Sequence, residues 1–267
     1  MVPAPRTVRL PAGLRLSYVD QGDRSASTVV LVPGPLDSWR CYEPVLDRLP
    51  PTVPGVAYSQ RGHGDSDKPA TGYSVQAFAD DLVALLDALG LDRPVVAGHS
   101  GAGLFARRFA LDHPERIAGL VLEATPPTLR GDASLESFLD SVLCDLRDPV
   151  DVGLVRRVIG DTTVRRWQRS PRPWCKRRSR CPLTYGERRS QGCSTTTTPP
   201  SWNAWPCQSS SSGEMPMTSS RETCRMPLLN AIPRAQLVTY AGTGHSPHWE
   251  DPSRFAADLV RFLERFT

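Results

Sequence analysis

A strand, a glycine-rich turn and a helix are expected in direct succession in PVVAGHSGAGLFARRFALDHP, residues 94–114. The apolar run before the turn is typical of a buried strand, and the spacing of apolar residues after it is typical of a helix. The turn, GHSGAG, has small residues around Ser100, which a strained strand-to-helix turn requires. It departs from G-x-S-x-G at one position, where Ala102 precedes Gly103. Phosphate loops of the GxGxxG and GxxxxGKS/T types do not fit it.

The alternation of strands and helices extends over both ends of the chain. Ser74 and Gly90 are suited to begin and end one helix, and Asp251 with Pro252 is suited to begin another. This alternation predicts an α/β fold with a mostly parallel sheet and helices on both faces. The expected strands are a pair within 6–20 and single strands within 27–35, 53–67, 94–114, 117–127 and 235–242; the expected helices lie within 38–49, 74–90, 94–114, 134–146, 152–159 and 251–266.

The composition changes abruptly inside the chain. The net charge is +4, yet residues 165–226 hold twelve Lys or Arg and three acids, so the rest of the chain is acidic. Five of the seven cysteines lie in this basic block, and no CxxC pair occurs. An odd count of unpaired cysteines and a start without an apolar signal core predict a cytoplasmic protein with free thiols and no zinc site. No run approaches the ~18 apolar residues of a membrane span.

Several motifs, in this order, resemble those of the α/β-hydrolase family. They are VPGP, SQRGHGDSDKP, GHSGAG, HPERIAGLVLEA and GTGHSPHWEDPSRF, and the resemblance covers about 1–160 and 227–267. It implies an eight-stranded sheet, a Ser–acid–His triad in that chain order, and a lid after the sixth strand. The expected division is an N-terminal part of the core in 1–127, a lid region with the basic block in 128–226, and a C-terminal part in 227–267.

The resemblance implies a role for each matching residue. Ser100 is the expected nucleophile and His245 its base, since a hydroxyl needs a base within hydrogen-bond reach. The oxyanion would bind the N–H of Gly101 and that of Leu36, because Pro35 occupies the usual donor position and has no N–H. Glu123 is a weak candidate for the acid, since some members place the acid after the sixth strand.

The function expected from these residues is that of a serine hydrolase. It would act on a small-molecule ester-like acyl substrate through an acyl-enzyme, without cofactor or metal. Relatives that use Asp at the elbow, the haloalkane dehalogenases and epoxide hydrolases, are disfavoured by Ser100. Cofactor-free haloperoxidases or perhydrolases and carbon–carbon bond hydrolases share the serine and remain alternatives. No nucleic-acid or membrane partner is expected.

The basic block does not match the family. The family commonly places its acid in a Gly-x-x-Asp loop after the seventh strand, but residues 165–226 contain no Asp, Ile or Val and only one Leu. Such a segment has little apolar surface to offset the cost of ordering its backbone, and it is a poor buried parallel strand. We therefore expect a disrupted or disordered seventh-strand region, a missing triad acid, and impaired activity.

Three interpretations of the block compete. It is a disordered basic insertion, or an arm that binds nucleic acid or other acidic partners in an inactive protein, or a segment translated in the wrong frame. The second is supported by tryptophans among the arginines, namely Trp167, Trp174, Trp202 and Trp205.

The frame hypothesis rests on back-translation. Read one base earlier, the Met215/Pro216 junction must encode Ala and the Met217/Thr218 junction must encode Asp. Serine codons that begin TC give only Val, Leu, Ile or Phe, and with free third bases the stretch from Cys207 can read PVLVLWGDADDVVP. This is an apolar strand followed by an acidic loop. The hypothesis is a compensated pair of frame changes near 160–170 and 225–228.

Overall fold

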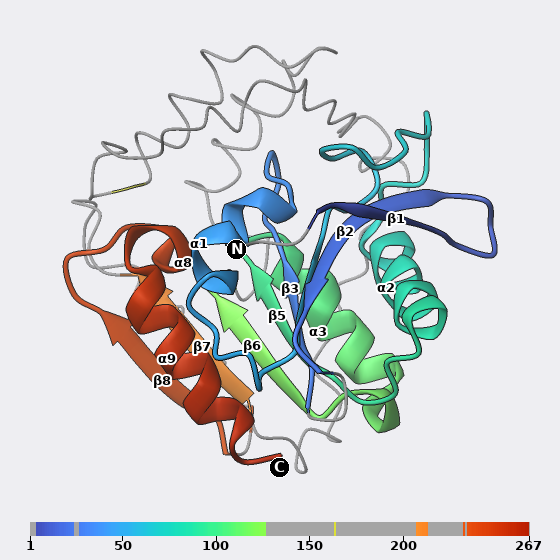
Figure 1. Cartoon of the computed structure of the whole chain (residues 1–267). Coiled ribbons are helices and arrows are strands. Elements are labelled where there is room, and N and C mark those ends of the chain that lie inside the picture. Colours follow the sequence, from blue (N-terminus) through green and yellow to red (C-terminus); the bar gives the residue numbers. More distant parts are fainter. Residues whose placement is uncertain are drawn as a thin grey trace.

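The structure is a computed structural model, and it describes residues 4–23, 27–126, 163, 232 and 234–266 together with the backbone of 207–212. The described residues form an eight-stranded sheet in the order β1-β2-β4-β3-β5-β6-β7-β8 (Figure 1). The β1/β2 and β2/β4 pairs are antiparallel, and every later pair is parallel. The strands are β1 Arg6–Arg9, β2 Arg15–Gln21, β3 Val29–Val32, β4 Gly55–Tyr58, β5 Val95–His99, β6 Gly119–Glu123, β7 Cys207–Ser212 and β8 Gln236–Tyr240.

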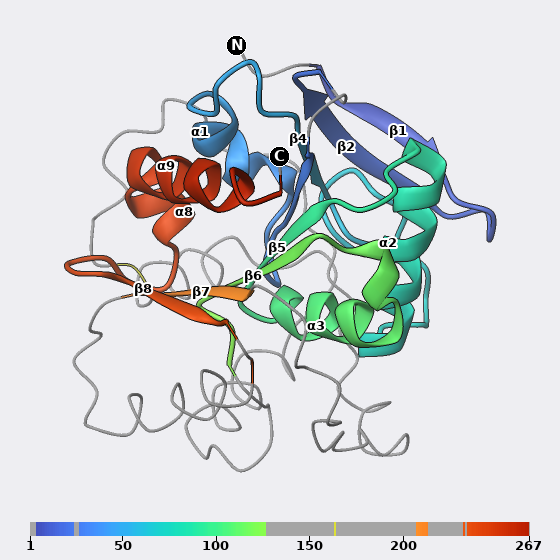
Figure 2. The ribbon, with the colours of Figure 1, turned by 90° about the horizontal axis from the view of Figure 1, so that it is seen from below.

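Helices cover both faces of this sheet, as Figure 2 shows from below. On one face α2 (Val75–Leu89) and α3 (Ala102–Asp112) pack against a core that contains Val96. On the other face α1 (Glu43–Leu46) and α9 (Pro252–Leu263), with the 3-10 helix η1 (Trp39–Tyr42), enclose a second core that contains Val95 and Ala97. Successive residues of β5 thus enter opposite cores, as a strand buried on both sides requires. The predicted α/β fold is confirmed.

Helix ends follow the predicted caps. The Ser74 hydroxyl accepts a hydrogen bond from the Ala77 N–H at 3.1 Å, and Gly90 ends α2 with φ of 65°. Asp251 accepts from the Arg254 N–H at 3.3 Å at the start of α9. The single helix expected in 38–49 is instead a 3-10 turn followed by the short α1. Among the described residues, no helix is long and apolar enough to cross a membrane.

The strand β7 differs from the sequence-based expectation. Cys207–Ser212 pairs in parallel with β6 on one side and β8 on the other, with Glu123 opposite Ser210 and Ser212 opposite Tyr240 (orange in Figure 1). Backbone hydrogen bonds to two neighbouring strands define this element, so its serine-rich composition does not prevent the assignment. The other residues of 165–226, and the helices expected in 134–146 and 152–159, lie outside the described residues.

Candidate active site

The turn after β5 places Ser100 at the carboxyl edge of the sheet. Ser100 has φ of 53°, a left-handed conformation that is strained for a residue with a side chain. Its N–H donates to the Glu123 carbonyl at 2.8 Å, which extends the β5/β6 pairing into the turn. A Cβ at Gly98 would lie 2.9 Å from the Gly103 backbone, so glycine is required where the helix returns over the strand. The GHSGAG segment therefore forms the strand-to-helix elbow predicted from the sequence.

His245 meets Ser100 across 145 residues of sequence. Its Nε2 lies 2.9 Å from Ser100 Oγ, within hydrogen-bond distance. The loop between β8 and α8 (Pro247–Glu250) delivers the ring to the same sheet edge as the elbow. In this geometry the hydroxyl can donate its proton to the imidazole, which is the first requirement of a serine nucleophile.

Two backbone N–H groups near the elbow, those of Leu36 and Gly101, are the candidate oxyanion donors. The Asp37 N–H donates to the Gly34 carbonyl at 3.3 Å and closes a turn with Pro35 and Leu36 at its centre. Leu36 has φ of 72°, as the third residue of a type II turn requires. Within the described part of the chain, neither Leu36 N–H nor Gly101 N–H has a hydrogen-bond partner. Both remain candidates for the oxyanion hole.

The loop that carries Leu36 rests directly on the elbow. A Cβ at Gly101 would lie 2.9 Å from Pro35 Cγ, so the proline ring fills the space beside the Gly101 backbone. On the far side, Gln60 Nε2 donates to the Pro33 carbonyl. These contacts hold the loop that carries Leu36 against the elbow.

Glu123 contacts a different histidine from the one expected. Its Oε1 accepts from the His248 N–H at 2.9 Å and from His248 Nδ1 at 2.6 Å, and its Oε2 accepts from the Tyr42 hydroxyl at 3.1 Å. Among the described residues, Glu123 makes no hydrogen bond to His245. In this geometry the carboxylate of Glu123 bonds to His248 and Tyr42, and its role as the acid that orients His245 stays a prediction.

Glu123 is nonetheless held as a carboxylate. Burial alone would raise its pKa, but the charge of His248 and the hydrogen bonds from it outweigh burial and hold the pKa below its ordinary value of 4.5. The side chains of Glu123 and His248 are 0% and 1% exposed. The pair is thus a buried, charge-assisted contact directly beneath the elbow.

His99 is a second partner that the sequence did not reveal. Burial lowers its pKa to about 3, so the ring is neutral at ordinary pH. Its Nε2 lies 2.9 Å from the His245 carbonyl oxygen, which can only accept, so Nε2 carries the proton. His99, His248 and Tyr42 are ordinary strand and helix residues in the sequence, and only the fold brings them under the Ser100–His245 pair.

The cluster of His99, Glu123 and His248 offers three potential metal ligands, whose ligand atoms all lie within 4.8 Å of one another. His99 Nε2 is already bonded to the His245 carbonyl, and both carboxylate oxygens of Glu123 accept hydrogen bonds from His248 and Tyr42. A metal bound by Glu123 and His248 would therefore have to break the hydrogen bond between them.

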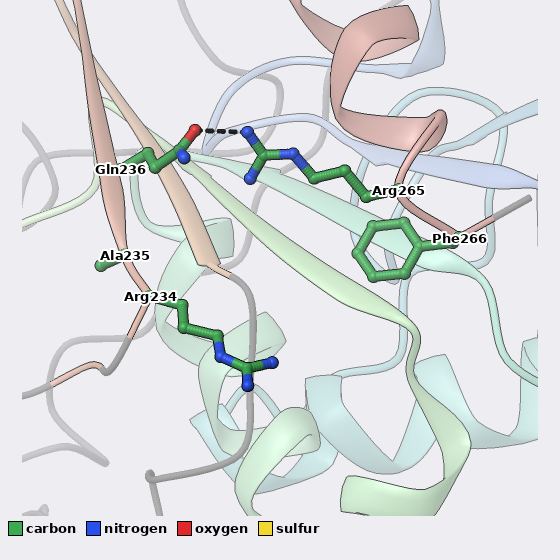
Figure 3. Close-up of a pocket in the computed structure, with 5 residues that line it drawn as sticks. All are labelled: Arg234, Ala235, Gln236, Arg265 and Phe266. Carbon is green, nitrogen blue, oxygen red and sulfur yellow. Dashed lines mark hydrogen bonds between the residues drawn. The ribbon is translucent and has the colours of Figure 1, made fainter.

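A surface pocket lies at the opposite edge of the sheet. Figure 3 shows its lining, with the Arg265 guanidinium bonded to the Gln236 side chain at 2.6 Å. Gln236 begins β8, whereas Ser100 follows the end of β5, so in a parallel sheet the two lie at opposite edges. The pocket has a volume of about 540 Å³ and contains no nucleophile or base. It is not the catalytic cavity.

Comparison with known proteins agrees with the fold and the elbow. A family profile described as "Alpha/beta hydrolase family" matches residues 29–258. The chain belongs to this family. The α/β-hydrolase also resembles a solved esterase from Exiguobacterium antarcticum with a TM-score of 0.78, at 16% identity, over 98% of this chain and 100% of that one. At that identity the likeness shows the fold alone.

Curated relatives of this α/β-hydrolase match it over about half of its length. It is 32% identical over 145 residues to a putative 2-succinyl-6-hydroxy-2,4-cyclohexadiene-1-carboxylate synthase of Bacillus subtilis, covering 52% of this chain and 53% of the relative. It is 38% identical over 126 residues to a non-heme chloroperoxidase of Streptomyces lividans, covering 46% of each. The chain thus spans about half the length of these relatives.

We predict that Glu123→Gln lowers the free energy of unfolding and makes that free energy less dependent on pH. Removing the charge should cost about 1.5–3 kcal/mol at pH 7, as for hydrogen bonds to a charged group. Because the folded pKa lies below 4.5, the stabilisation is present above pH 4.5 and is lost as the pH falls through the folded pKa. Urea unfolding between pH 7 and pH 3 measures both effects. Tyr42→Phe keeps the carboxylate and should keep the wild-type pH dependence; parallel curves for wild type and Glu123→Gln would refute the assignment.

We predict that Gly101→Ala disturbs the oxyanion donors through Pro35. Gly101 has φ of −59°, so alanine is tolerated by the backbone, and the new Cβ meets only the Pro35 ring. Displacing the loop should lower kcat for ester hydrolysis by up to about 10²-fold. Pro35→Ala removes the ring, so the double variant should recover most of the loss. An equal loss in the single and double variants would contradict the contact.

Proposed function

We propose that this chain is a serine hydrolase that cleaves an ester-like acyl substrate through an acyl-enzyme. The observation that supports it most is the 2.9 Å contact between Ser100 Oγ and His245 Nε2 at a strained elbow. Gly101, one candidate oxyanion donor, directly follows Ser100, and the loop that carries the other, Leu36, packs on Gly101 through Pro35. Nucleophile, base and oxyanion donors are the groups that acyl transfer needs.

The proposed reaction uses these groups in two steps. His245 Nε2 accepts the Ser100 proton as Oγ bonds to the acyl carbon, and the carbonyl oxygen becomes an oxyanion that the Gly101 and Leu36 N–H groups stabilise. His245 then gives the proton to the leaving alkoxide. In the second step His245 activates a water molecule, which attacks the acyl carbon and releases Ser100.

We also propose that the activity of this chain is impaired. The block where the family places its triad acid contains no Asp, and Glu123 is bonded to His248 instead of His245. Loss of the orienting acid costs about 10⁴-fold in kcat in well-studied serine enzymes. The frame hypothesis gives the cause: Cys207–Ser212, which forms β7, is the same stretch that the other frame reads as an apolar strand.

A second candidate is a perhydrolase-type reaction on the same acyl-enzyme. The 38% identity to the Streptomyces lividans non-heme chloroperoxidase favours it. Hydrogen peroxide would then replace water as the acyl acceptor and yield a peracid. The nucleophile and base would be the same, so only the acceptor distinguishes the two reactions.

We predict that the wild type hydrolyses a short-chain nitrophenyl ester and that Ser100→Ala loses about 100-fold of that rate. We expect this 100-fold loss because serine enzymes that lack the triad acid keep a residual activity, and that activity still depends on the serine. Nitrophenolate release is measured with and without hydrogen peroxide; acceleration by peroxide favours the second candidate. Equal rates in wild type and Ser100→Ala would refute both.

We predict that a chain with 165–226 restored to the other reading frame is up to about 10⁴-fold more active than this one. The reason is that the restored segment supplies an apolar seventh strand and an Asp after it. The coding DNA across residues 155–230 is sequenced first, and the restored chain is then assayed on the same ester. A DNA segment that cannot encode an apolar strand and Asp in the other frame would refute the frame hypothesis.

A further inference from the structure

The loop that carries His245 is held through its backbone on both sides of that residue. Glu250 Oε1 accepts from the Gly244 N–H at 2.9 Å and from the Ser246 N–H at 3.3 Å. Between them, the His245 carbonyl accepts from His99 Nε2 at 2.9 Å. Three consecutive residues, with His245 in the middle, are thus fixed by two buried side chains.

Glu250 is suited to hold this loop rigidly. It ends the four-residue helix α8, and its carboxylate reaches back over that helix to the residues before it. The residue is only 8% exposed, so its hydrogen bonds are shielded from water. Hydrogen bonds from backbone N–H to a buried carboxylate are stronger than those between neutral groups.

The positions of the two N–H groups determine where the imidazole points. His245 Nε2 reaches Ser100 Oγ only if the His245 backbone keeps its place and its φ and ψ angles. The His245 carbonyl and the Ser246 N–H belong to the same peptide, so their two hydrogen bonds fix the plane that follows His245, while the Gly244 bond holds the chain on the other side of the residue. Without these bonds the loop could still follow β8, but the ring would no longer be confined to the elbow.

We propose that Glu250 is a positioning residue for His245, and that it maintains the Ser100–His245 contact through the loop backbone. The catalytic part of this inference rests on the proposed serine hydrolase function. The role matters most in this chain, because its block 165–226 offers no Asp to orient the imidazole. In this role Glu250 acts through the backbone of residues 244–246.

The experiment compares Glu250→Ala, Glu250→Gln and the control Glu115→Ala. Glu115 is a glutamate 67% exposed in the 3-10 turn η2 (Pro114–Arg116), outside the His245 loop. Amide hydrogen exchange resolved to single residues measures directly how strongly each backbone N–H of the loop is protected. In Glu250→Ala the Gly244 and Ser246 amides should exchange faster, while the His248 amide, which Glu123 holds, should not change. Glu250→Gln keeps one acceptor oxygen and should be intermediate.

Two further measurements separate positioning from mere stability. The kcat for the nitrophenyl ester should fall by up to about 10²-fold in Glu250→Ala with little change in KM, because a displaced base affects the chemical step. The NMR titration of the His245 Hε1 proton should also shift, because the ring leaves Ser100. The control should match the wild type in both measurements.

The outcomes distinguish this inference from the proposed function. A wild type without ester hydrolysis would refute the proposed function, but the exchange and titration measurements would still decide whether Glu250 positions the ring. Unchanged exchange at Gly244 and Ser246 in Glu250→Ala would overturn the inference. So would faster exchange with an unchanged His245 titration, since the carboxylate would then hold the loop without directing the imidazole. If Glu250→Ala fails to fold, the isosteric Glu250→Gln gives the same test.

Discussion

The hydrogen bond from the Ser100 N–H to the Glu123 carbonyl holds the elbow on which the site depends. A non-glycine residue in the left-handed region costs about 1–3 kcal/mol, and it persists only where the surrounding structure fixes it. Here the parallel β5/β6 pairing continues into the turn at 2.8 Å, and the close approach of Gly98 and Gly103 leaves α3 no other path. The strain exposes the hydroxyl at the sheet edge, where the His245 loop reaches it.

Beneath the elbow, the side chain of the same Glu123 organises a second layer. Its backbone fixes Ser100, while its buried carboxylate fixes His248 and Tyr42. His248 lies in α8 and Tyr42 ends η1, so one residue of β6 joins these two segments. His99, the last residue of β5, completes this layer by holding the His245 carbonyl. Ser100 and His245 are therefore both held by residues of the neighbouring strands β5 and β6.

Features that depend on a local residue pattern could be predicted from the sequence. Contacts that arise only when distant segments pack together could not. The elbow at Ser100 could be predicted because it needs small residues around the serine, and the approach of His245 followed from the place of its loop late in the chain. The helix of 74–90 could be found because Ser74 and Gly90 cap it. The hydrogen-bond partner of Glu123 could not be predicted from the sequence. Three histidines (His99, His245 and His248) lie near this edge of the sheet, and only the fold shows that Glu123 contacts His248. The strand at Cys207–Ser212 was not predicted either. Its serine-rich sequence is atypical of a buried strand, and the assignment depends on its backbone pairing with β6 and β8.

We propose that Ser100 is a nucleophile activated by His245. Intact-mass analysis after treatment with an alkyl fluorophosphonate tests it most directly, because this reagent forms a stable adduct with an activated serine. We expect one adduct per wild-type chain, mapped to Ser100, and none in Ser100→Ala; His245→Ala should label far more slowly. An adduct on another residue, or equal labelling of the wild type and Ser100→Ala, would contradict it.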